Sequence, residues 1–501
     1  MPMAFTHREA TPLDRVPRLA PGEFTAWVKR QVAGGARIAA LFGAPEQDGV
    51  HLYAVMALDR DCGLAAARTG PVSRYESLTP DCPQAHWFER EIYEQWGVLP
   101  ENHPWLKPIR FHAGYGANSM IRPRPGETSY FRVEGPEIHE VAVGPVHAGV
   151  IEPGHFRFQC HGEKVLHLEI SLGYQHRGVE ALLTQTADPR TAPLIETLSG
   201  DATIGHALAH QGVLSALCGT AAPARALAIR SLALELERLA NHTGDLGALA
   251  GDVGYLPAAS YLGRIRGDYL NMTALICGNR FGRGIVRRGG VGFDLDERLA
   301  DELAARLARA RVDTAGALNL LFESASVLGR FENTGTLSVQ TALDLGLVGP
   351  PARACGLARD ARRAYPAPGA YSPGSGDGLD IPVRLHDTGD VFARALVRRL
   401  EIEASLDFCE AAVRRLPGGE LVRAPGASAP DSLAVGVAEG WRGEIWHLAL
   451  TGNDGRPRAY KVVDPSFRNW FGLAYALRGE QVSDFPLCNK SFNLSYCGHD
   501  L

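Results

Sequence analysis

The sequence predicts an α+β fold, in which a small N-terminal α/β domain precedes a larger, mostly helical domain with small β elements. Residues from about 20 to 112 alternate short apolar runs with helical patterns. A stretch rich in Gly, Pro and charge follows at 113–140, and beyond it most apolar residues recur at helical spacing. We therefore predict one domain over 1–112, a linker over 113–140 and a second domain over 141–501.

In the N-terminal domain, the apolar runs 36–42 and 50–58 have the length of strands. The charged and aromatic segment HWFEREIYEQWG (86–97) comes after them. We expect two strands within a small α/β domain.

In the second domain, alternating stretches over 141–178 suggest a few strands. The clearest helix begins near Pro223, since proline suits the first helical turn. Two further helices are predicted, one from about Asp301 and one over 390–406. The segment 202–224 contains no charged residue, but it carries two His and several Gly, so it predicts a buried helix and not a membrane span.

Composition excludes several function classes. The net charge is −5 with no run of like charges, so we expect no nucleic-acid partner. Nine Cys without any CxxC pair argue against a disulfide scaffold and against a zinc or iron-sulfur site. The N-terminus has no signal-peptide pattern, and neither a phosphate-binding loop nor a dinucleotide-binding glycine motif occurs, so we expect no direct NAD binding.

Several segments carry a family resemblance. FEREIYEQWGVLPENHPWLKPIRF (88–111) resembles the 30 kDa-type subunit of respiratory complex I. The chain beyond this segment resembles the complex I 49 kDa-type subunit and the nickel-iron hydrogenase large subunit, which share one fold. The segments that carry this second resemblance are GPVHAGVIEPGHFRF (144–158), YQHRGVEAL (174–182), ALAIRSLALELERLANHTGDLGALAGDVGY (226–255), RRGGV (287–291), GDVFARALVRRLEIEASL (389–406) and the C-terminal segment 464–501. The fused order is that of the large subunits of formate hydrogenlyase and hydrogenase-4, which belong to the group 4 nickel-iron hydrogenases.

The resemblance implies a metal site that this chain departs from. Active hydrogenases hold nickel and iron with two Cys pairs, because soft thiolates bind these metals and can bridge them. Here Ser199 and Ala202 stand at the first pair, and Ser495 and Gly498 at the second. Cys497 lies one residue away from a ligand position. We therefore expect no metal on this chain.

Without the metal, the resemblance implies the complex I use of the fold, with a quinone chamber beside a partner's iron-sulfur cluster. His147 and His155 match approximately the family's loop with two His. A neutral imidazole can hydrogen-bond a quinone carbonyl and deliver a proton, so these two residues are candidates for a quinone or proton cavity. The alternative is that both are satisfied loop histidines. The Tyr that complex I uses as second quinone donor is not evident.

Asp201 and His206 are candidates for the chemistry of this cavity, and His206 keeps its spacing in the first motif. If Asp201 is buried without a partner, its pKa should rise and it could donate a proton. Alternatively, Asp201 caps the following helix, since Asp is a favoured N-cap residue.

The RGVE motif (177–180) is intact. The resemblance implies that Glu180 starts a proton path from the cavity, with Arg177 holding it ionised or orienting it. The alternative is a purely structural ion pair. Arg394 and Arg398 lie on one helix face with Asp390 and Glu401. In this family such arginines help surround the partner's cluster, and the alternative is an internal ion-pair stripe.

We therefore expect an oxidoreductase subunit at the cytoplasmic face of the cell membrane, inactive alone, in a NADH-quinone oxidoreductase-like complex. A metal-free cavity would couple electron transfer to quinone or proton chemistry. The expected partners are a small iron-sulfur subunit, a ferredoxin-like subunit and membrane antiporter-like subunits. The chain itself would bind no cofactor other than a quinone. The alternatives are an active group 4 hydrogenase large subunit and a structural bridge without chemistry.

Overall fold

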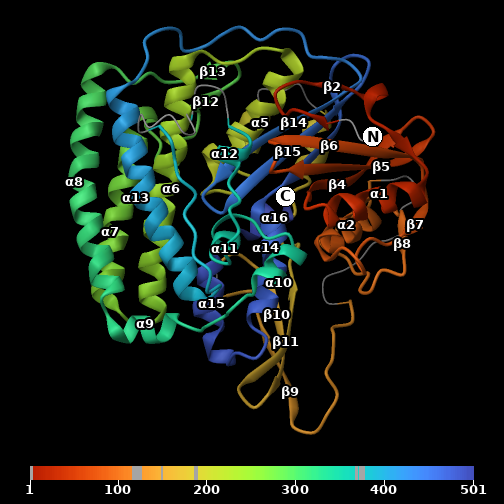
Figure 1. Cartoon of the computed structure of the whole chain (residues 1–501), viewed down its shortest axis with the longest axis horizontal. Coiled ribbons are helices and arrows are strands. Elements are labelled where there is room, and N and C mark those ends of the chain that lie inside the picture. Colours follow the sequence, from red (N-terminus) through yellow and green to blue (C-terminus); the bar gives the residue numbers. More distant parts are fainter. Residues whose placement is uncertain (1–3, 116–126, 148–150, 186–189, 367–370, 372–378) are drawn as a thin grey trace.

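The computed structural model describes residues 4–115, 127–147, 151–185, 190–366, 371 and 379–501 (Figure 1). The strands are β1 (Ala4–Phe5), β2 (Thr11–Pro12), β3 (Arg18–Leu19), β4 (Arg37–Glu46), β5 (Gly49–Leu58), β6 (Gly63–Pro71), β7 (Arg74–Glu76), β8 (Leu99–Glu101), β9 (Ile138–Val143), β10 (His155–His161), β11 (Lys164–Ser171), β12 (Val286–Arg287), β13 (Gly290–Val291), β14 (Ser432–Gly440), β15 (Gly443–Thr451) and β16 (Pro457–Val463). The helices are α1 (Pro21–Ala33), α2 (His86–Trp96), α3 (Val179–Gln185), α4 (Thr191–Glu196), α5 (Thr203–Cys218), α6 (Ala224–Asp252), α7 (Leu256–Cys277), α8 (Glu297–Phe322), α9 (Ala325–Phe331), α10 (Val339–Asp344), α11 (Gly349–Arg353), α12 (Ala361–Ala364), α13 (Val391–Arg414), α14 (Pro465–Ala476), α15 (Phe485–Phe492) and α16 (Tyr496–Asp500). The predicted α+β class is confirmed, with a β-rich N-terminal region before a mostly helical one.

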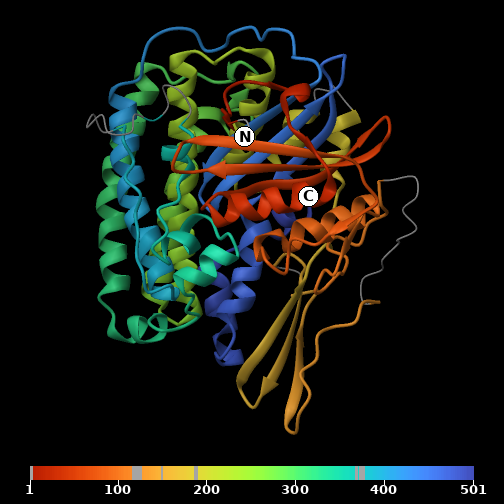
Figure 2. The same ribbon diagram turned by 45° about the vertical axis from the view of Figure 1, so that its right-hand side comes forward.

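The N-terminal sheet has the order β1-β6-β5-β4, with β3 paired to β6. Its two longest strands, β4 and β5, are the strands predicted from the apolar runs. Both are buried along most of their length. Strands buried on both faces have continuous apolar sequences instead of alternating ones, which explains why these runs stood out. Figure 2 shows α1 and α2 beside this sheet.

The N-terminal sheet is joined to the C-terminal sheet, whose order is β16-β15-β14-β2. Strand β2 comes from the N-terminal region and pairs with β14, where Pro12 lies opposite Ser432. The two sheets also share one apolar core, because Leu433, Trp446 and Leu448 pack in the same cluster as the side chains of β4 and β5. The N-terminal region is therefore anchored to the rest of the chain by both backbone pairing and apolar burial. Part of the predicted linker 113–140 lies outside the described residues.

The helical region is built on α6, α7, α8 and α13, which stand side by side in Figure 1. Helix α6 begins after Pro223, as predicted. Helix α13 begins after Asp390, whose carboxylate accepts a hydrogen bond from the backbone N–H of Ala393 at 2.8 Å. Helix α8 begins four residues before the predicted Asp301, because Asp296 caps it. The Pro/Gly-rich stretch before α13 lies mostly outside the described residues.

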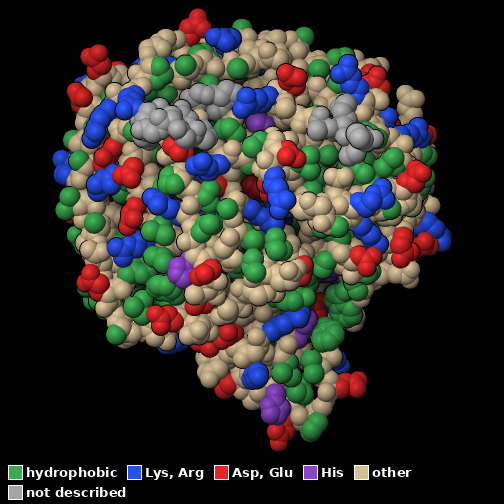
Figure 3. All heavy atoms as spheres, viewed as in Figure 1, with side chains coloured by type: hydrophobic (Ala, Val, Ile, Leu, Met, Phe, Trp, Pro, Cys, Tyr) green, Lys and Arg blue, Asp and Glu red, His purple; other side chains and the backbone are tan. Residues whose placement is uncertain are grey.

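Most of the uncharged segment 202–224 forms α5, which lies against β14 and is largely buried, as predicted. Over the described ranges, no helix combines the length and the hydropathy needed to cross a membrane. A smaller sheet, β11-β10-β9, extends from the body at the lower edge of Figure 1. On the face in Figure 3, side chains of both charge signs are interspersed without a patch of one sign.

Candidate functional site

The two motif halves that the family resemblance singled out meet in space. Ser199 lies just before α5, and Ser495 is the N-cap of α16. Their hydroxyl oxygens are 3.0 Å apart, and both side chains are buried. The Ser495 hydroxyl also accepts a hydrogen bond from the backbone N–H of Gly498 at 2.9 Å. The positions expected to correspond to metal ligands therefore share one buried, polar site.

An ion pair forms one wall of this site. Arg442 donates to both carboxylate oxygens of Asp201, at 2.6 and 2.8 Å, and lies 3.3 Å from the Ser199 hydroxyl. Burial alone would raise the pKa of Asp201, but the positive charge of Arg442 and its hydrogen bonds lower it. Asp201 is therefore buried with a cationic partner, and the rise of its pKa that was expected for an unpaired carboxylate does not occur. Nor does Asp201 cap α5, because the N-cap residue is Ala202.

A second pair, His206 and Asp464, lies next to the first. His206 Nε2 is 3.0 Å from Asp464 Oδ2, and both side chains are buried. The other carboxylate oxygen of Asp464 accepts the backbone N–H of Ser466 at 2.7 Å, which starts α14. A Cβ atom placed on Gly498 would lie 2.7 Å from this carboxylate. The backbone at Gly498 therefore has no room for a side chain while Asp464 keeps its position.

Glu180 lies at the start of α3 in a buried cluster at the seam between the N-terminal region and the rest of the chain. Its Oε1 accepts from Lys461 Nζ at 3.0 Å and from the backbone N–H of Val462 at 2.9 Å, and its Oε2 accepts from Gln95 at 3.3 Å. The expected partner Arg177 is exposed and donates instead to the backbone oxygen of Thr197 at 2.9 Å. The cation that contacts Glu180 is therefore Lys461, contrary to the sequence-based expectation.

Lys461 also holds a second carboxylate. Its Nζ lies 2.6 Å from each carboxylate oxygen of Glu91, which pairs in addition with Arg110. Arg110 reaches the backbone oxygen of His499 at 2.8 Å, next to the C-terminus. Burial alone would raise the pKa of Glu91, but the charges of Lys461 and Arg110 overcome this effect and lower it. Sequence reasoning missed this network, although Glu91 and Arg110 lie inside the recognised segment 88–111.

A cavity of about 270 Å³ opens beside the seam cluster. Its wall includes Gln95, Tyr115, Glu180, Tyr460 and Lys461. A buried carboxylate that borders such a cavity can exchange protons with water there. This position fits the proton-exchange role that the resemblance implies for Glu180.

The two loop histidines lie near α16. His147 Nε2 is 2.9 Å from the backbone oxygen of Gly154, and His155 Nδ1 is 3.2 Å from that of Gly144. The backbone of Gly154 lies so close to the Tyr496 ring that an added Cβ atom would be 2.5 Å from it. The loop is thereby packed next to Ser495. Burial lowers the pKa of His155 and favours its neutral form.

Arg394 and Arg398 are buried inside the chain, with exposed fractions of 0% and 1%. Arg394 donates to the Ser491 hydroxyl at 2.8 Å, and Arg398 donates to Asp245 at 2.9 Å. On the same helix, Glu401 pairs with Arg353 at 2.7 Å. Arg398 and Glu401 therefore belong to internal ion pairs, whereas Arg394 makes buried hydrogen bonds to a hydroxyl and to backbone oxygens. As the chain is described, neither arginine presents its side chain on an outer face.

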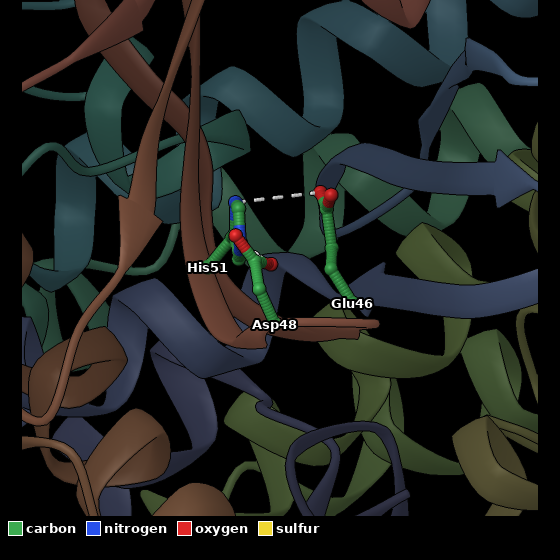
Figure 4. Close-up of side chains that lie close together, drawn as sticks. All are labelled: Glu46, Asp48 and His51. Atoms are coloured by element: carbon green, nitrogen blue, oxygen red, sulfur yellow. Dashed lines mark hydrogen bonds and ion pairs between the residues drawn. The ribbon is translucent and has the colours of Figure 1, made fainter.

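One further group of side chains has the composition of a metal site. Glu46, Asp48 and His51 lie together at the turn between β4 and β5 (Figure 4). His51 Nε2 is 2.7 Å from Asp48. Both carboxylates already have cations, since Arg18 lies 3.1 Å from Asp48 and Arg68 lies 3.2 Å from Glu46. These contacts identify the group as a hydrogen-bonded cluster of ion pairs.

Known families match both regions of the chain. Residues 252–431 match the family described as respiratory-chain NADH dehydrogenase, 49 Kd subunit, and residues 42–123 match respiratory-chain NADH dehydrogenase, 30 Kd subunit. Formate hydrogenlyase subunit 5 of Escherichia coli (strain K12) is 30% identical over 448 residues, which cover 84% of this chain and 76% of that protein. The carbon monoxide-induced hydrogenase of Rhodospirillum rubrum is 30% identical over 71% of this chain and 97% of its own length.

The fused arrangement has a counterpart among the relatives, and the fold has one among solved structures. The C/D subunit of NADH-quinone oxidoreductase from Bdellovibrio bacteriovorus is 25% identical over 85% of this chain and 83% of its own length. A chain in the structure of the membrane-bound sulfane sulfur reductase, an archaeal respiratory membrane complex, shares the fold with a TM-score of 0.65 and 23% identity, over 73% of this chain and 99% of that one. The chain therefore belongs to the oxidoreductase family that joins the complex I 30 kDa and 49 kDa subunits and includes the large subunits of formate hydrogenlyase and hydrogenase-4.

Proposed function

We propose that this chain is the coupling subunit of a membrane-associated, complex I-like redox assembly. Electrons would arrive at an iron-sulfur cluster of a partner, and the site around Ser199 and Ser495 would supply proton or quinone chemistry without a metal. The observation that carries the proposal is the 3.0 Å contact between these two hydroxyls, because it brings together the two segments that the resemblance aligns with the metal-binding motifs of hydrogenases.

The side chains at this site do not fit a nickel-iron centre. The serine hydroxyls are hydrogen-bonded and are harder ligands than the thiolates that these metals prefer. Asp464 closes the space at Gly498. Burial, and the charge of Glu152, raise the pKa of the neighbouring Cys497 to about 11, so that it stays a thiol at neutral pH. We therefore route no step of the proposed chemistry through a metal.

The polar groups of the site suit proton transfer. In the proposal, Glu180 exchanges protons with the cavity at the seam, Asp201 provides a fixed charge beside Ser199, and His206 provides an imidazole that contacts Asp464. Asp201 stays ionised because of Arg442, so it would stabilise positive charge and would not donate a proton at neutral pH. His206 is the better proton carrier of the two.

A quinone, if one binds, would be held by the loop beside α16. His155 uses both ring nitrogens, since Nδ1 contacts the Gly144 oxygen and Nε2 accepts from Arg157 at 3.3 Å. His147 uses Nε2 for the Gly154 oxygen, and among the described residues its Nδ1 has no hydrogen-bond partner. We therefore favour His147 over His155 as the residue that would bind a quinone carbonyl.

The proposed partners are a small iron-sulfur subunit, a ferredoxin-like subunit and antiporter-like membrane subunits, with this chain peripheral on the cytoplasmic face. The assembly, and not the chain alone, would be the active enzyme. Because Arg394 and Arg398 are buried, we assign them to the support of the surface that contacts the partner cluster, not to the contact itself.

Metal analysis by mass spectrometry on the purified intact assembly tests this proposal, with the subunits identified in the same sample. We expect iron from the partner clusters without nickel, together with iron-sulfur and antiporter-like subunits. Stoichiometric nickel on this chain would favour the active hydrogenase and overturn the proposal.

A further inference from the structure

Five buried side chains form a continuous row of hydrogen bonds that begins at the candidate site. In order along the row, they are Asp464, His206, His447, Tyr460 and His210. The successive distances are 3.0 Å from Asp464 Oδ2 to His206 Nε2, 3.1 Å from His206 Nδ1 to His447 Nε2, 2.9 Å from His447 Nδ1 to the Tyr460 hydroxyl, and 2.7 Å from that hydroxyl to His210 Nδ1. Each of the three inner residues makes two contacts in the row: His206 and His447 use both ring nitrogens, and the Tyr460 hydroxyl has a partner on either side.

The row has an inner and an outer end. His206 and His447 are 0% exposed and Asp464 is 1% exposed, whereas Tyr460 and His210 are each 7% exposed. The inner end, Asp464, lies against the backbone of Gly498. The row therefore runs from the candidate site toward the outside of the fold.

Three elements hold these side chains in place. His206 and His210 lie four residues apart on α5 and so project from the same side of the helix. His447 belongs to β15 and Tyr460 to the adjacent strand β16. Because all three elements are packed in the core, the row is fixed before any reaction occurs.

The protonation states of the side chains are consistent with hydrogen bonds that are all donated in one direction, toward Asp464. Burial alone would raise the pKa of Asp464, but the hydrogen bond from His206 and the charge of Arg442 lower it, so Asp464 is an acceptor. Burial lowers the pKa of His210 to about 4 and that of His447 well below its usual range, so both are neutral. A neutral imidazole has one donor and one acceptor nitrogen, as each place in the row requires.

We propose that this row is a proton relay, which carries protons between the outer end at His210 and the candidate site at Asp464. At rest, every member donates toward Asp464: His210 Nδ1–H to the Tyr460 oxygen, Tyr460 O–H to His447 Nδ1, His447 Nε2–H to His206 Nδ1, and His206 Nε2–H to the carboxylate. When His210 Nε2 takes up a proton, each of these four protons moves by one hydrogen bond, and Asp464 becomes protonated.

The step conserves protons and charge. One proton enters at His210, one bond to hydrogen forms at Asp464, and each histidine ends in its other neutral tautomer. Asp464 then gives this proton to the acceptor at the site, in the proposed function a quinone that takes its electrons from the partner's cluster. The carboxylate is thereby restored, and the members return to rest by rotation or by the reverse tautomer shift. The last part rests on the proposed function, because only a proton-consuming site would draw protons through the row.

The geometry of the relay can be tested on the full chain without any activity. We expect ¹⁵N NMR of histidine-labelled protein at neutral pH to show the Nε2–H tautomer at His206 and His447 and the Nδ1–H tautomer at His210. Assignments come from single His→Gln variants. A cationic member, or two unprotonated nitrogens that face each other, would overturn the relay.

Proton uptake by the intact assembly tests transport. The partner clusters are first reduced with dithionite, the excess dithionite is removed, and a pH-indicator dye then follows uptake when decylubiquinone is added as the acceptor. We expect Tyr460→Phe to slow uptake at least tenfold, because the phenyl ring has no hydroxyl to pass a proton on. His210→Gln should do the same, since an amide keeps a hydrogen bond but cannot exchange tautomers.

The matched control is Tyr269→Phe. Tyr269 is also buried, and its hydroxyl is 2.8 Å from Thr314 on the far side of the helical region. We expect uptake within twofold of the unmodified assembly. Normal uptake in both row variants would overturn the relay. No uptake even in the unmodified assembly would count against the proposed function, and the tautomers would then decide the relay by themselves.

Discussion

Ser199 and Ser495 are hydrogen-bonded at 3.0 Å although 296 positions separate them in the sequence. The contact joins the loop before α5 to the N-terminus of α16, so two segments of the larger region that are distant in sequence meet there. Ser495 also caps α16 through the Gly498 N–H. The two hydroxyls therefore hold this part of the fold together through hydrogen bonds to each other and to the backbone, which thiolates bound to a metal would not form in the same way.

This contact makes Gly498 a sensitive position. We expect Gly498→Ala to lower the free energy of unfolding by about 1–3 kcal/mol, because the new methyl group overpacks against the Asp464 carboxylate, which His206 and Ser466 hold in place. Gly263→Ala on α7 is the control, because a Cβ atom there meets nothing within 4 Å. It should be stabilising by about 0.5–1 kcal/mol. Equal effects in urea unfolding would contradict the packing argument.

Lys461 should be among the most sensitive lysines to substitution. Replacing it with Met leaves the carboxylates of Glu91 and Glu180 buried without their shared cation, and removal of one partner of a buried ion pair costs about 3–5 kcal/mol. Lys29→Met removes an exposed pair with Asp81 and should cost about 0–1 kcal/mol. Chemical unfolding of both variants measures the difference. If adding Glu180→Gln to Lys461→Met restores no stability, the carboxylate is not the source of the loss.

Sequence patterns could predict the elements but not the partners of buried charges. Strands β4 and β5 and helices α6 and α13 follow from runs, periodicity and caps that are local in the chain. The ion pair of Asp201 is different, because Arg442 is 241 positions away. A local reading could therefore consider only a helix cap or an unpaired carboxylate, and neither is what the structure has.

The same limit applies to the candidate site. Ser199 and Ser495 stand at positions that can be compared with the motifs of the family, so the sequence could identify both as site residues. His447 and Tyr460 belong to no recognised motif, and their place in the row depends on the pairing of β15 with β16 and on the packing of α5. The adjacent Arg177 was the natural partner for Glu180 in the sequence, whereas the fold supplies Lys461 from 281 positions away.

Acid should destabilise the chain through Glu91. The pKa of Glu91 is lowered in the folded state to about 2 from an ordinary value of 4.5, so its contribution is complete above pH 4.5 and is lost as the pH falls toward 2. Such a group adds a slope of at most about 1.4 kcal/mol per pH unit in this window. We expect urea unfolding between pH 6 and pH 3 to show a smaller loss for Glu91→Gln than for the unmodified chain. Identical slopes would mean that other carboxylates carry the acid sensitivity.

Glu180→Gln separates a working proton path from a purely structural bridge. The amide oxygen can still accept from the backbone N–H of Val462, and the amide N–H can donate to Gln95 once the Gln95 amide turns over, but the amide cannot exchange a proton. We therefore expect turnover of the assembled complex to fall about 10²–10⁴-fold, the usual contribution of a general acid–base group. The measurement is the pH gradient formed in inverted membrane vesicles with dithionite-reduced methyl viologen as donor and decylubiquinone or protons as acceptor. Native gels check that assembly is intact. Glu403→Gln, in an exposed pair with Arg399, should leave the gradient unchanged. An unchanged gradient in Glu180→Gln as well would favour the structural bridge.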